Sequence, residues 1–141
     1  MRQRLVVAAT AAETEALGRE IGREVAPGSF LLLEGPLGAG KTCLVRGLAA
    51  GLGIDPAAVH SPSFTLVNEY PGGRCPLLHA DGYRLPEAAD LAELGLEEAA
   101  AEGAVVAVEW PRRFAPPPGA PVWRLRLEPE GERRRITVIP P

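Results

Sequence analysis

The sequence predicts an α/β fold in which a mixed, mainly parallel sheet is flanked by helices and ends in a C-terminal β-hairpin. Two short, continuously apolar runs, 30–33 and 104–108, are typical of strands buried on both faces, as in a parallel sheet. A stretch with helical periodicity follows the first run, and Leu alternates with Arg over 122–127 near the end of the chain. Strands that alternate with helices and close in hairpins form an α/β domain.

Helical patterns occupy three stretches. Residues 10–13 have the form of a capping box, which predicts a helix that starts there and ends before Pro27. A second helix is predicted over 42–52, directly after a glycine-rich loop. A third helical region begins at Pro86 and is interrupted at Gly95.

Two hairpins are also predicted, because strand-like stretches lie on either side of turn residues. Each consists of strand, turn and strand: 64–70, 71–74 and 75–80 in the first, and 122–127, 128–131 and 135–139 in the second. Between the second helix and the first hairpin, Asp55 and Pro56 predict a capped short turn.

Length and composition fit one soluble domain over 1–141. A chain of 141 residues can bury a core without a metal or a disulfide staple. The net charge of −3 argues against a protein whose main role is to grip nucleic-acid phosphates. Cys43 and Cys75 are too few for a disulfide scaffold, which favours a reduced, cytoplasmic setting.

Nothing in the sequence predicts membrane insertion. The apolar run 5–9 follows Arg2 and Arg4, as in a signal peptide, but it gives way at once to Glu13 and Glu15. No stretch approaches the roughly 18 apolar residues of a membrane span. We therefore expect no membrane partner.

A glycine-rich segment, 35–42, matches the phosphate-binding pattern G-x-x-x-x-G-K-[ST] in full and lies between a predicted buried strand and a predicted helix. Glycines let backbone N–H groups surround an anion, and the helix adds unpaired donors and the positive end of its dipole. The lysine of the pattern reaches the β- and γ-phosphates, and its threonine hydroxyl ligates Mg²⁺. We therefore predict a single P-loop NTPase domain whose nucleotide-binding residues include Gly35, Leu37, Gly38, Ala39, Gly40, Lys41, Thr42 and Cys43.

Lys41 is the only lysine among 15 basic residues. A compact ammonium suits a triphosphate better than a guanidinium fork does. Because the chain uses Arg at every other basic position, the single Lys at 41 supports a phosphate-binding role for this residue. The alternative without a binding role is a glycine-rich turn with an exposed lysine. Random order would give the pattern in about one in a thousand such chains, which argues against this alternative. A single lysine also excludes the Asn-Lys-x-Asp motif of guanine-specific GTPases. By elimination we expect ATP, with magnesium.

A P-loop site needs an acidic group at the end of a buried strand to help hold Mg²⁺. Glu109 ends the run 104–108, and Asp81 ends a second apolar stretch, 77–80. Either acid could be no more than a solvated strand terminus. From the residues alone both Glu109 and Asp81 are candidates for this acidic partner, and we predict that both act in catalysis together with Lys41.

Other polar and aromatic residues have an ordinary structural interpretation first. Ser63 belongs to a Ser-Pro-Ser triplet that commonly enters a strand, and His79 is more often a packed histidine than a ligand. Trp110 is by default a partly buried anchor. The arginines at 133–135 resemble the charges that block strand addition at a hairpin edge, although they could touch a nucleic acid.

Four strings, in order, resemble one family: 35–42, 61–70 (Ser-Pro-Ser-Phe-Thr-Leu-Val-Asn-Glu-Tyr), 79–85 (His-Ala-Asp-Gly-Tyr-Arg-Leu) and 108–111 (Val-Glu-Trp-Pro). Together they closely resemble the TsaE family, the ATPase component of bacterial tRNA threonylcarbamoyladenosine biosynthesis. The resemblance covers nearly the whole chain. It implies a P-loop core with a mixed sheet, weak ATP hydrolysis, and two protein partners, TsaD and TsaB, with tRNA met only through their complex.

The resemblance also implies residue roles. Lys41 and Thr42 match the phosphate and magnesium positions, and Glu109 matches the acid implicated in Mg²⁺ binding. Asp81 matches an acid implicated in catalysis or switching. Ser63 falls in a switch-like loop and Trp110 matches an aromatic near the nucleotide, which makes both of them candidates for cofactor binding.

The chain departs from the family pattern at four positions: Pro36 replaces an acidic residue, Cys43 and Ser63 replace threonines, and Gly82 replaces a leucine after Asp81. Ser63 retains a hydroxyl, whereas Gly82 loosens the backbone beside Asp81. Loss of a hydroxyl at Cys43 could weaken a phosphate contact, but Lys41 and Thr42, the predicted grip on the triphosphate, are unchanged.

The function predicted from the sequence is that of a P-loop ATPase whose hydrolysis drives or resets a tRNA-modifying complex. One alternative is a nucleotide-gated binding module in which hydrolysis is incidental. Another is a small-molecule kinase, for which the chain has little room for a substrate domain and lid.

Overall fold

The computed structural model describes residues 2–36, 38–62, 66–82, 94–111 and 114–141. Its helices and strands, in chain order, are β1 (Arg4–Ala8), α1 (Ala11–Glu24), β2 (Phe30–Glu34), α2 (Lys41–Gly51), the 3₁₀ turn η1 (Pro56–Ala58), β3 (Val67–Tyr70), β4 (Leu77–Asp81), α4 (Leu96–Ala101), β5 (Val105–Glu109), β6 (Val122–Glu130) and β7 (Arg133–Ile139).

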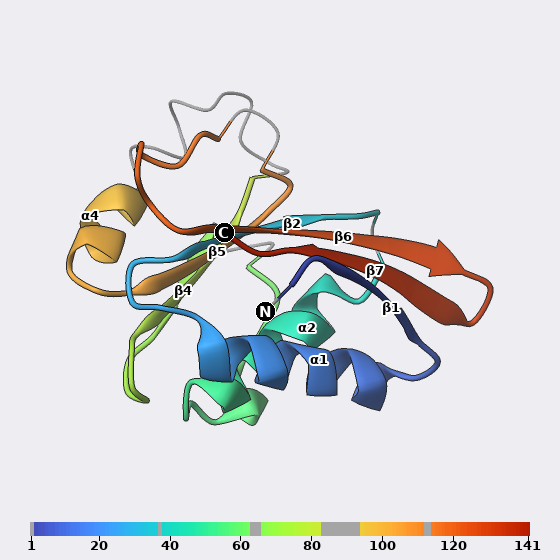
Figure 1. Cartoon of the computed structure of the whole chain (residues 1–141). Coiled ribbons are helices and arrows are strands. Elements are labelled where there is room, and N and C mark those ends of the chain that lie inside the picture. Colours follow the sequence, from blue (N-terminus) through green and yellow to red (C-terminus); the bar gives the residue numbers. More distant parts are fainter. Residues whose placement is uncertain (1, 37, 63–65, 83–93, 112–113) are drawn as a thin grey trace.

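One seven-stranded sheet organises the described part of the chain, in the order β1-β7-β6-β2-β5-β4-β3 (Figure 1). The centre is parallel: β2 lies between β6 and β5, and β5 pairs with β4. The edges are antiparallel, with β3 on β4 at one side and β6, β7 and β1 at the other. The predicted mixed sheet is therefore confirmed, and its parallel character is confined to the centre, since half of the six pairings are antiparallel.

Helices cover the two faces of the sheet unequally. Helices α1 and α2 lie side by side along one face, whereas α4 covers the opposite face only near β2, β4 and β5 (Figure 1). Alternation along β2 explains how one strand serves both layers: Leu31 and Leu33 enter the core beneath α1 and α2, and Phe30 and Leu32 enter the core beneath α4. The central strand is thus buried on both faces, as its continuous apolar run predicts.

Glycines bring α1 and α2 unusually close together. Gly18 and Gly22 of α1 face Gly47 and Gly51 of α2, and a methyl group on Gly47 would lie 1.9 Å from the carbonyl oxygen of Glu15. Each pair has the small-xxx-small spacing that lets helix backbones approach. This close packing of the two helices fixes the position of the start of α2 relative to α1.

Most predicted elements are present, with two differences. Residues 4–8, which the sequence analysis weighed only as a rejected signal peptide, form edge strand β1 against β7. Strand β6 continues to Glu130, so the predicted turn at 128–131 begins three residues too early. The chain reverses at Gly131, where φ is 62°, and Pro129 still pairs with Arg134.

No helix in the described ranges is long and apolar enough to cross a bilayer. The predicted start of the third helical region at Pro86 lies outside the described residues, while Gly95, where an interruption was predicted, is the left-handed N-cap of α4.

Candidate nucleotide-binding site

A glycine loop, formed by Gly35, Pro36 and residues 38–40, joins β2 to α2. Gly38 and Gly40 have positive φ values of 78° and 97°, a conformation that residues with a side chain rarely adopt. Gly35 is required for a steric reason, because a Cβ there would lie 2.5 Å from the carbonyl oxygen of Leu127 on β6. The sequence therefore needs glycine at these places for the loop to fold between two neighbouring strands and a helix.

Helix α2 begins without help from its own side chains. Its N-cap is Gly40, which has no side chain to accept a hydrogen bond from the first-turn N–H groups. The first N–H groups of a helix have no acceptor within the helix, and they carry the positive end of its dipole. The start of α2 therefore offers N–H donors beside the loop, as an anion site requires.

Lys41 is the first residue of α2 and is only 5% exposed. Its Nζ donates a hydrogen bond to the carbonyl oxygen of Gly35 at 2.5 Å and lies 3.6 Å from the centroid of the Trp110 ring. Burial lowers the pKa of Lys41, while the negative charges of Glu109 and Asp81 raise it and offset part of that effect. The ammonium is thus held at the loop by a carbonyl, a ring face and two nearby acids.

Asp81 and Glu109 stand side by side at the carboxyl ends of β4 and β5. They are directly paired in the ladder, and Glu109 also pairs with Leu33 on β2. Both are largely buried, with exposures of 7% and 6%. Backbone bonds fix this edge: Gly82 N–H donates to the Glu109 carbonyl at 2.8 Å, and Trp110 N–H donates to the Leu33 carbonyl at 3.1 Å. The structure therefore brings both predicted acids to the lysine.

His79 contacts Glu109 from beneath the site. It is fully buried, as expected of a packed histidine, and its Nε2 forms a short hydrogen bond with Oε2 of Glu109. Its Nδ1 has no hydrogen-bond partner among the described residues. The sequence analysis did not anticipate that contact, because 30 residues separate the two side chains along the chain.

Two residues at this edge adopt backbone conformations that are uncommon outside glycine. Trp110 has φ of 54° and Leu66, whose carbonyl accepts from Asp81 N–H at 2.8 Å, has φ of 67°. Such strain is found where the surrounding structure imposes it, often at functional sites. Trp110 also lines a surface pocket with Glu34, Gly35 and Pro111, at the Gly35 end of the loop.

The structure describes three of the five remaining predicted site residues. Thr42 lies in the first turn of α2 and is partly exposed, and Ala39 is buried in the core beneath α1 and α2. Cys43 points toward α1, where its Sγ donates to the carbonyl oxygen of Ala11 at 3.1 Å. Burial raises the pKa of its thiol, and Glu15 adds to the increase. Leu37 and Ser63 lie outside the described residues.

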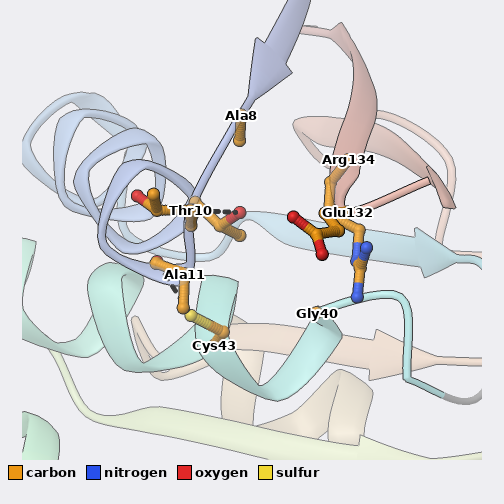
Figure 2. Close-up of a pocket in the computed structure, with 8 residues that line it drawn as sticks. Ala8, Thr10, Ala11, Gly40, Cys43, Glu132 and Arg134 are labelled. Carbon is orange, nitrogen blue, oxygen red and sulfur yellow. Dashed lines mark hydrogen bonds between the residues drawn. The ribbon is translucent and has the colours of Figure 1, made fainter. Parts of the chain in front are cut away.

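The sequence analysis missed a second pocket, at the Gly40 end of the loop (Figure 2). Residues from β1, α1, α2 and the β6–β7 hairpin line it: Ala8, Thr10, Ala11, Thr14, Gly40, Cys43, Glu132 and Arg134. Arg134 donates a hydrogen bond to the Gly38 carbonyl at 3.0 Å, across 96 positions of sequence. No sequence signal joins these segments, although Thr10 was identified as a helix cap.

The donors at the site fit a magnesium ion that is shared with phosphates. No group of three His, Cys, Asp or Glu side chains that could hold a metal occurs in the described ranges. Mg²⁺ does not need such a group, because it is commonly bound through one or two carboxylates together with phosphates and water. Thr42, Glu109 and Asp81 supply a hydroxyl and two carboxylates next to the glycine loop, which is this kind of donor set.

Comparisons with known proteins agree with this architecture. The family model for threonylcarbamoyl adenosine biosynthesis protein TsaE matches residues 8–136. A tRNA threonylcarbamoyladenosine biosynthesis protein TsaE from Treponema pallidum is 40% identical over 134 residues, which cover 94% of this chain and 97% of that protein. The TsaE protein of Nostoc sp. is 50% identical over 103 residues, 70% of this chain and 62% of that protein.

A solved structure shows the same fold. The crystal structure of Bacillus subtilis YdiB superposes with a TM-score of 0.75 at 30% sequence identity, covering 97% of this chain and 84% of that chain. The family model, the close relatives and the superposition all extend over most of the chain. The chain belongs to the TsaE family of tRNA threonylcarbamoyladenosine biosynthesis proteins.

Proposed function

We propose that this protein binds Mg-ATP at the glycine loop and hydrolyses it slowly, and that hydrolysis drives or resets the TsaD–TsaB complex in the cytoplasm during tRNA threonylcarbamoyladenosine modification. The observation that carries the proposal is the convergence of Lys41, Asp81 and Glu109 beside the uncapped start of α2. An unpaired helix start attracts an anion, and the buried lysine and two acids supply what triphosphate chemistry needs.

Binding follows from groups that are already in place. The first-turn N–H groups of α2 donate to the α- and β-phosphates, and the Lys41 ammonium exchanges the Gly35 carbonyl and the Trp110 ring for β- and γ-phosphate oxygens. Thr42 and Glu109 are the residues that would hold magnesium, which supplies charge neutralisation along the phosphates. Because Lys41 is already buried, little further desolvation of its charge is required on binding.

Hydrolysis then depends on positioning rather than on a covalent intermediate. Asp81 stands one strand away from Glu109 at the same edge, where its carboxylate accepts a hydrogen bond from the attacking water. Lys41 offsets the charge that develops on the phosphoryl oxygens. The His79 side chain orients the Glu109 carboxylate through its hydrogen bond with Oε2.

The family assignment supports the partner half of the proposal. Its members are named for a modification pathway, and a small domain that turns over ATP slowly would serve such a pathway by changing the state of a partner. The partners in this proposal are TsaD and TsaB, with tRNA reached through them.

The test is phosphate release from Mg-ATP by the full chain, alone and with a purified TsaD–TsaB pair. Lys41→Ala serves as the blank, and Arg46→Ala, on the exposed side of the same helix, is the matched control for loss of a positive charge. We expect slow release alone, faster release with the pair, and none above background for Lys41→Ala in either case.

Three outcomes separate the proposal from its alternatives. ATP binding without any response of turnover to the pair would contradict the partner-coupled ATPase. Binding of the pair that requires ATP but survives Asp81→Asn, with turnover lost, would favour a nucleotide-gated binding module. Transfer of the phosphate to an added metabolite would indicate a kinase.

A further inference from the structure

Left-handed backbone is uncommon outside glycine, and in the described ranges it occurs at two other residues, Leu66 and Trp110, with φ of 67° and 54°. Both adjoin the acids of the site. Trp110 directly follows Glu109, and the carbonyl oxygen of Leu66 accepts a hydrogen bond from Asp81 N–H at 2.8 Å. Each acid therefore has one such residue next to it.

Leu66 stands where the chain enters strand β3. The first residue of that strand, Val67, pairs with Ala80 of β4, and the bond from Asp81 N–H to Leu66 extends the ladder by one position. On its other side, Leu66 N–H donates to the Pro62 carbonyl at 2.9 Å, which turns the chain away from β4. An extended Leu66 would continue β3 along β4, so the left-handed conformation is what joins this turn to Asp81.

The backbone of Leu66, and not its side chain, carries this arrangement. Leu66 is half-buried, and among the residues that the structure describes it belongs to neither hydrophobic core of the sheet. Asn and Gly adopt left-handed backbone more readily than Leu does. Strain of this kind persists only where the surroundings impose it, and the hydrogen bonds of the Leu66 N–H and carbonyl oxygen do so here.

The backbone at Asp81 is held from both sides of β4. Leu66 accepts the Asp81 N–H on the β3 side, and the next N–H, that of Gly82, donates to the Glu109 carbonyl on β5 at 2.8 Å. Glycine at 82 leaves the chain free to rotate just after Asp81, so the bond to Leu66 acts on Asp81 more directly. Because reaction rate depends steeply on alignment, a small shift of this backbone would move the Asp81 carboxylate away from the attacking water.

We propose that Leu66 is a positioning residue for Asp81: its left-handed backbone holds the Asp81 N–H, and through it the carboxylate, where the attacking water is oriented. This inference rests on the proposed function, in which Asp81 accepts a hydrogen bond from that water. Its added content is that an apolar residue on the β3 side sets the geometry of attack through its backbone.

The experiment measures kcat and KM for phosphate release from Mg-ATP by the full chain with the TsaD–TsaB pair. Leu66→Asn, which tolerates the left-handed conformation, should keep kcat within about twofold of wild type. Leu66→Ile, whose branched side chain disfavours it, should lower kcat by about tenfold or more and leave KM unchanged. A packing role for the side chain would reverse this order, since Ile keeps the apolar volume and Asn loses it.

Val67→Ile is the matched control, because it introduces the same side chain at the neighbouring position, inside β3, where branched residues are favoured. It should leave kcat unchanged. Thermal melting shows whether each variant is folded at the assay temperature. Should Leu66→Ile not fold, Leu66→Ala replaces it: Ala favours left-handed backbone less than Asn does, so its kcat should be about threefold below that of Leu66→Asn.

The outcomes separate this inference from the proposed function. Wild-type kcat in Leu66→Ile, an equal loss in Leu66→Asn and Leu66→Ile, or a kcat in Leu66→Ala at or above that of Leu66→Asn would overturn the positioning role while the ATPase stood. Wild-type turnover in Asp81→Asn, measured in the same series, would overturn the assigned role of Asp81 in hydrolysis, and this inference with it.

Discussion

The starts of the two long helices lie next to each other and are built in opposite ways. In α1, Thr10 Oγ1 accepts from Glu13 N–H at 3.2 Å, and the Glu13 carboxylate accepts from Ala9 N–H in a short hydrogen bond. This is a shifted form of the capping box, because the Glu13 carboxylate bonds the N–H of Ala9 and not that of the N-cap residue Thr10. In α2, the N-cap is Gly40 in a left-handed conformation, and no side chain caps the helix.

The difference shows which helix start serves the fold and which serves a ligand. Capping stabilises a helix by about 1 kcal/mol, so leaving α2 uncapped lowers the stability of the ligand-free protein. The donors that α1 satisfies internally remain available in α2. The glycine contacts between the helices then keep the uncapped start in place without using those donors.

The largest expected effect comes from separating the two helices. In Gly47→Ala the new methyl group would lie 1.9 Å from the Glu15 carbonyl oxygen, so α1 and α2 must move apart. We expect a loss of about 3 kcal/mol in the free energy of unfolding, at the upper end of the overpacking range. Urea denaturation measures it. Arg46→Ala, one residue earlier and exposed, should change stability by less than about 0.5 kcal/mol.

Next in size is the loss of the lysine at the uncapped start. Lys41→Ala should weaken Mg-ATP binding by about tenfold to a hundredfold, since a charge-assisted contact contributes about 1.5–3 kcal/mol. Calorimetric titration tests this, again with Arg46→Ala as the control. An equal loss in both variants would mean that net charge, and not the position of Lys41, governs affinity.

A smaller effect is expected at the capped start. Glu13→Ala removes one half of the capping box and should lower the free energy of unfolding by about 0.5–1 kcal/mol. Because Glu13 serves only α1, triphosphate affinity should not change. Glu15→Ala, two residues later in α1, removes the same charge and is the control for stability. If Glu13→Ala weakened triphosphate binding as much as it weakened folding, the two helix starts would not be independent.

The smallest effect is a pH dependence. Burial lowers the pKa of Lys41, so between that lowered value and the ordinary lysine value of about 10.4 the unfolded chain binds more protons than the folded one. The free energy of unfolding of the ligand-free protein therefore gains a rising contribution with pH in this window. The difference between wild type and Lys41→Met isolates it, and a difference that falls with pH would contradict it.

The sequence allowed the loop and both acids to be predicted because each is a local signal. The pattern 35–42 fixes a strand, a loop and a helix start at once. Asp81 and Glu109 each follow an apolar run, and parallel strands bring their carboxyl ends to one edge. Their direct pairing depends on the register of β4 and β5, which no local signal specifies.

What the sequence could not supply depends on long-range contacts. The contact of Arg134 with Gly38 spans 96 positions, and that of His79 with Glu109 spans 30. Strand β1 was missed because its short run, half exposed at the sheet edge, has little apolar periodicity. The spacing of Gly18 and Gly22, repeated at Gly47 and Gly51, was a signal that could have been recognised, since both pairs fall in predicted helices.

The most direct test of the contrast between the two helix starts is amide hydrogen exchange, residue by residue, with and without Mg-ATP. The account predicts that the amides of residues 40–43, at the start of α2, become strongly protected when the nucleotide binds. It predicts that the amides of Glu13 and Ala9, already bonded in the capping box, change little. Unchanged exchange at 40–43 under saturating Mg-ATP would contradict the claim that the uncapped start of α2 is the nucleotide-binding element.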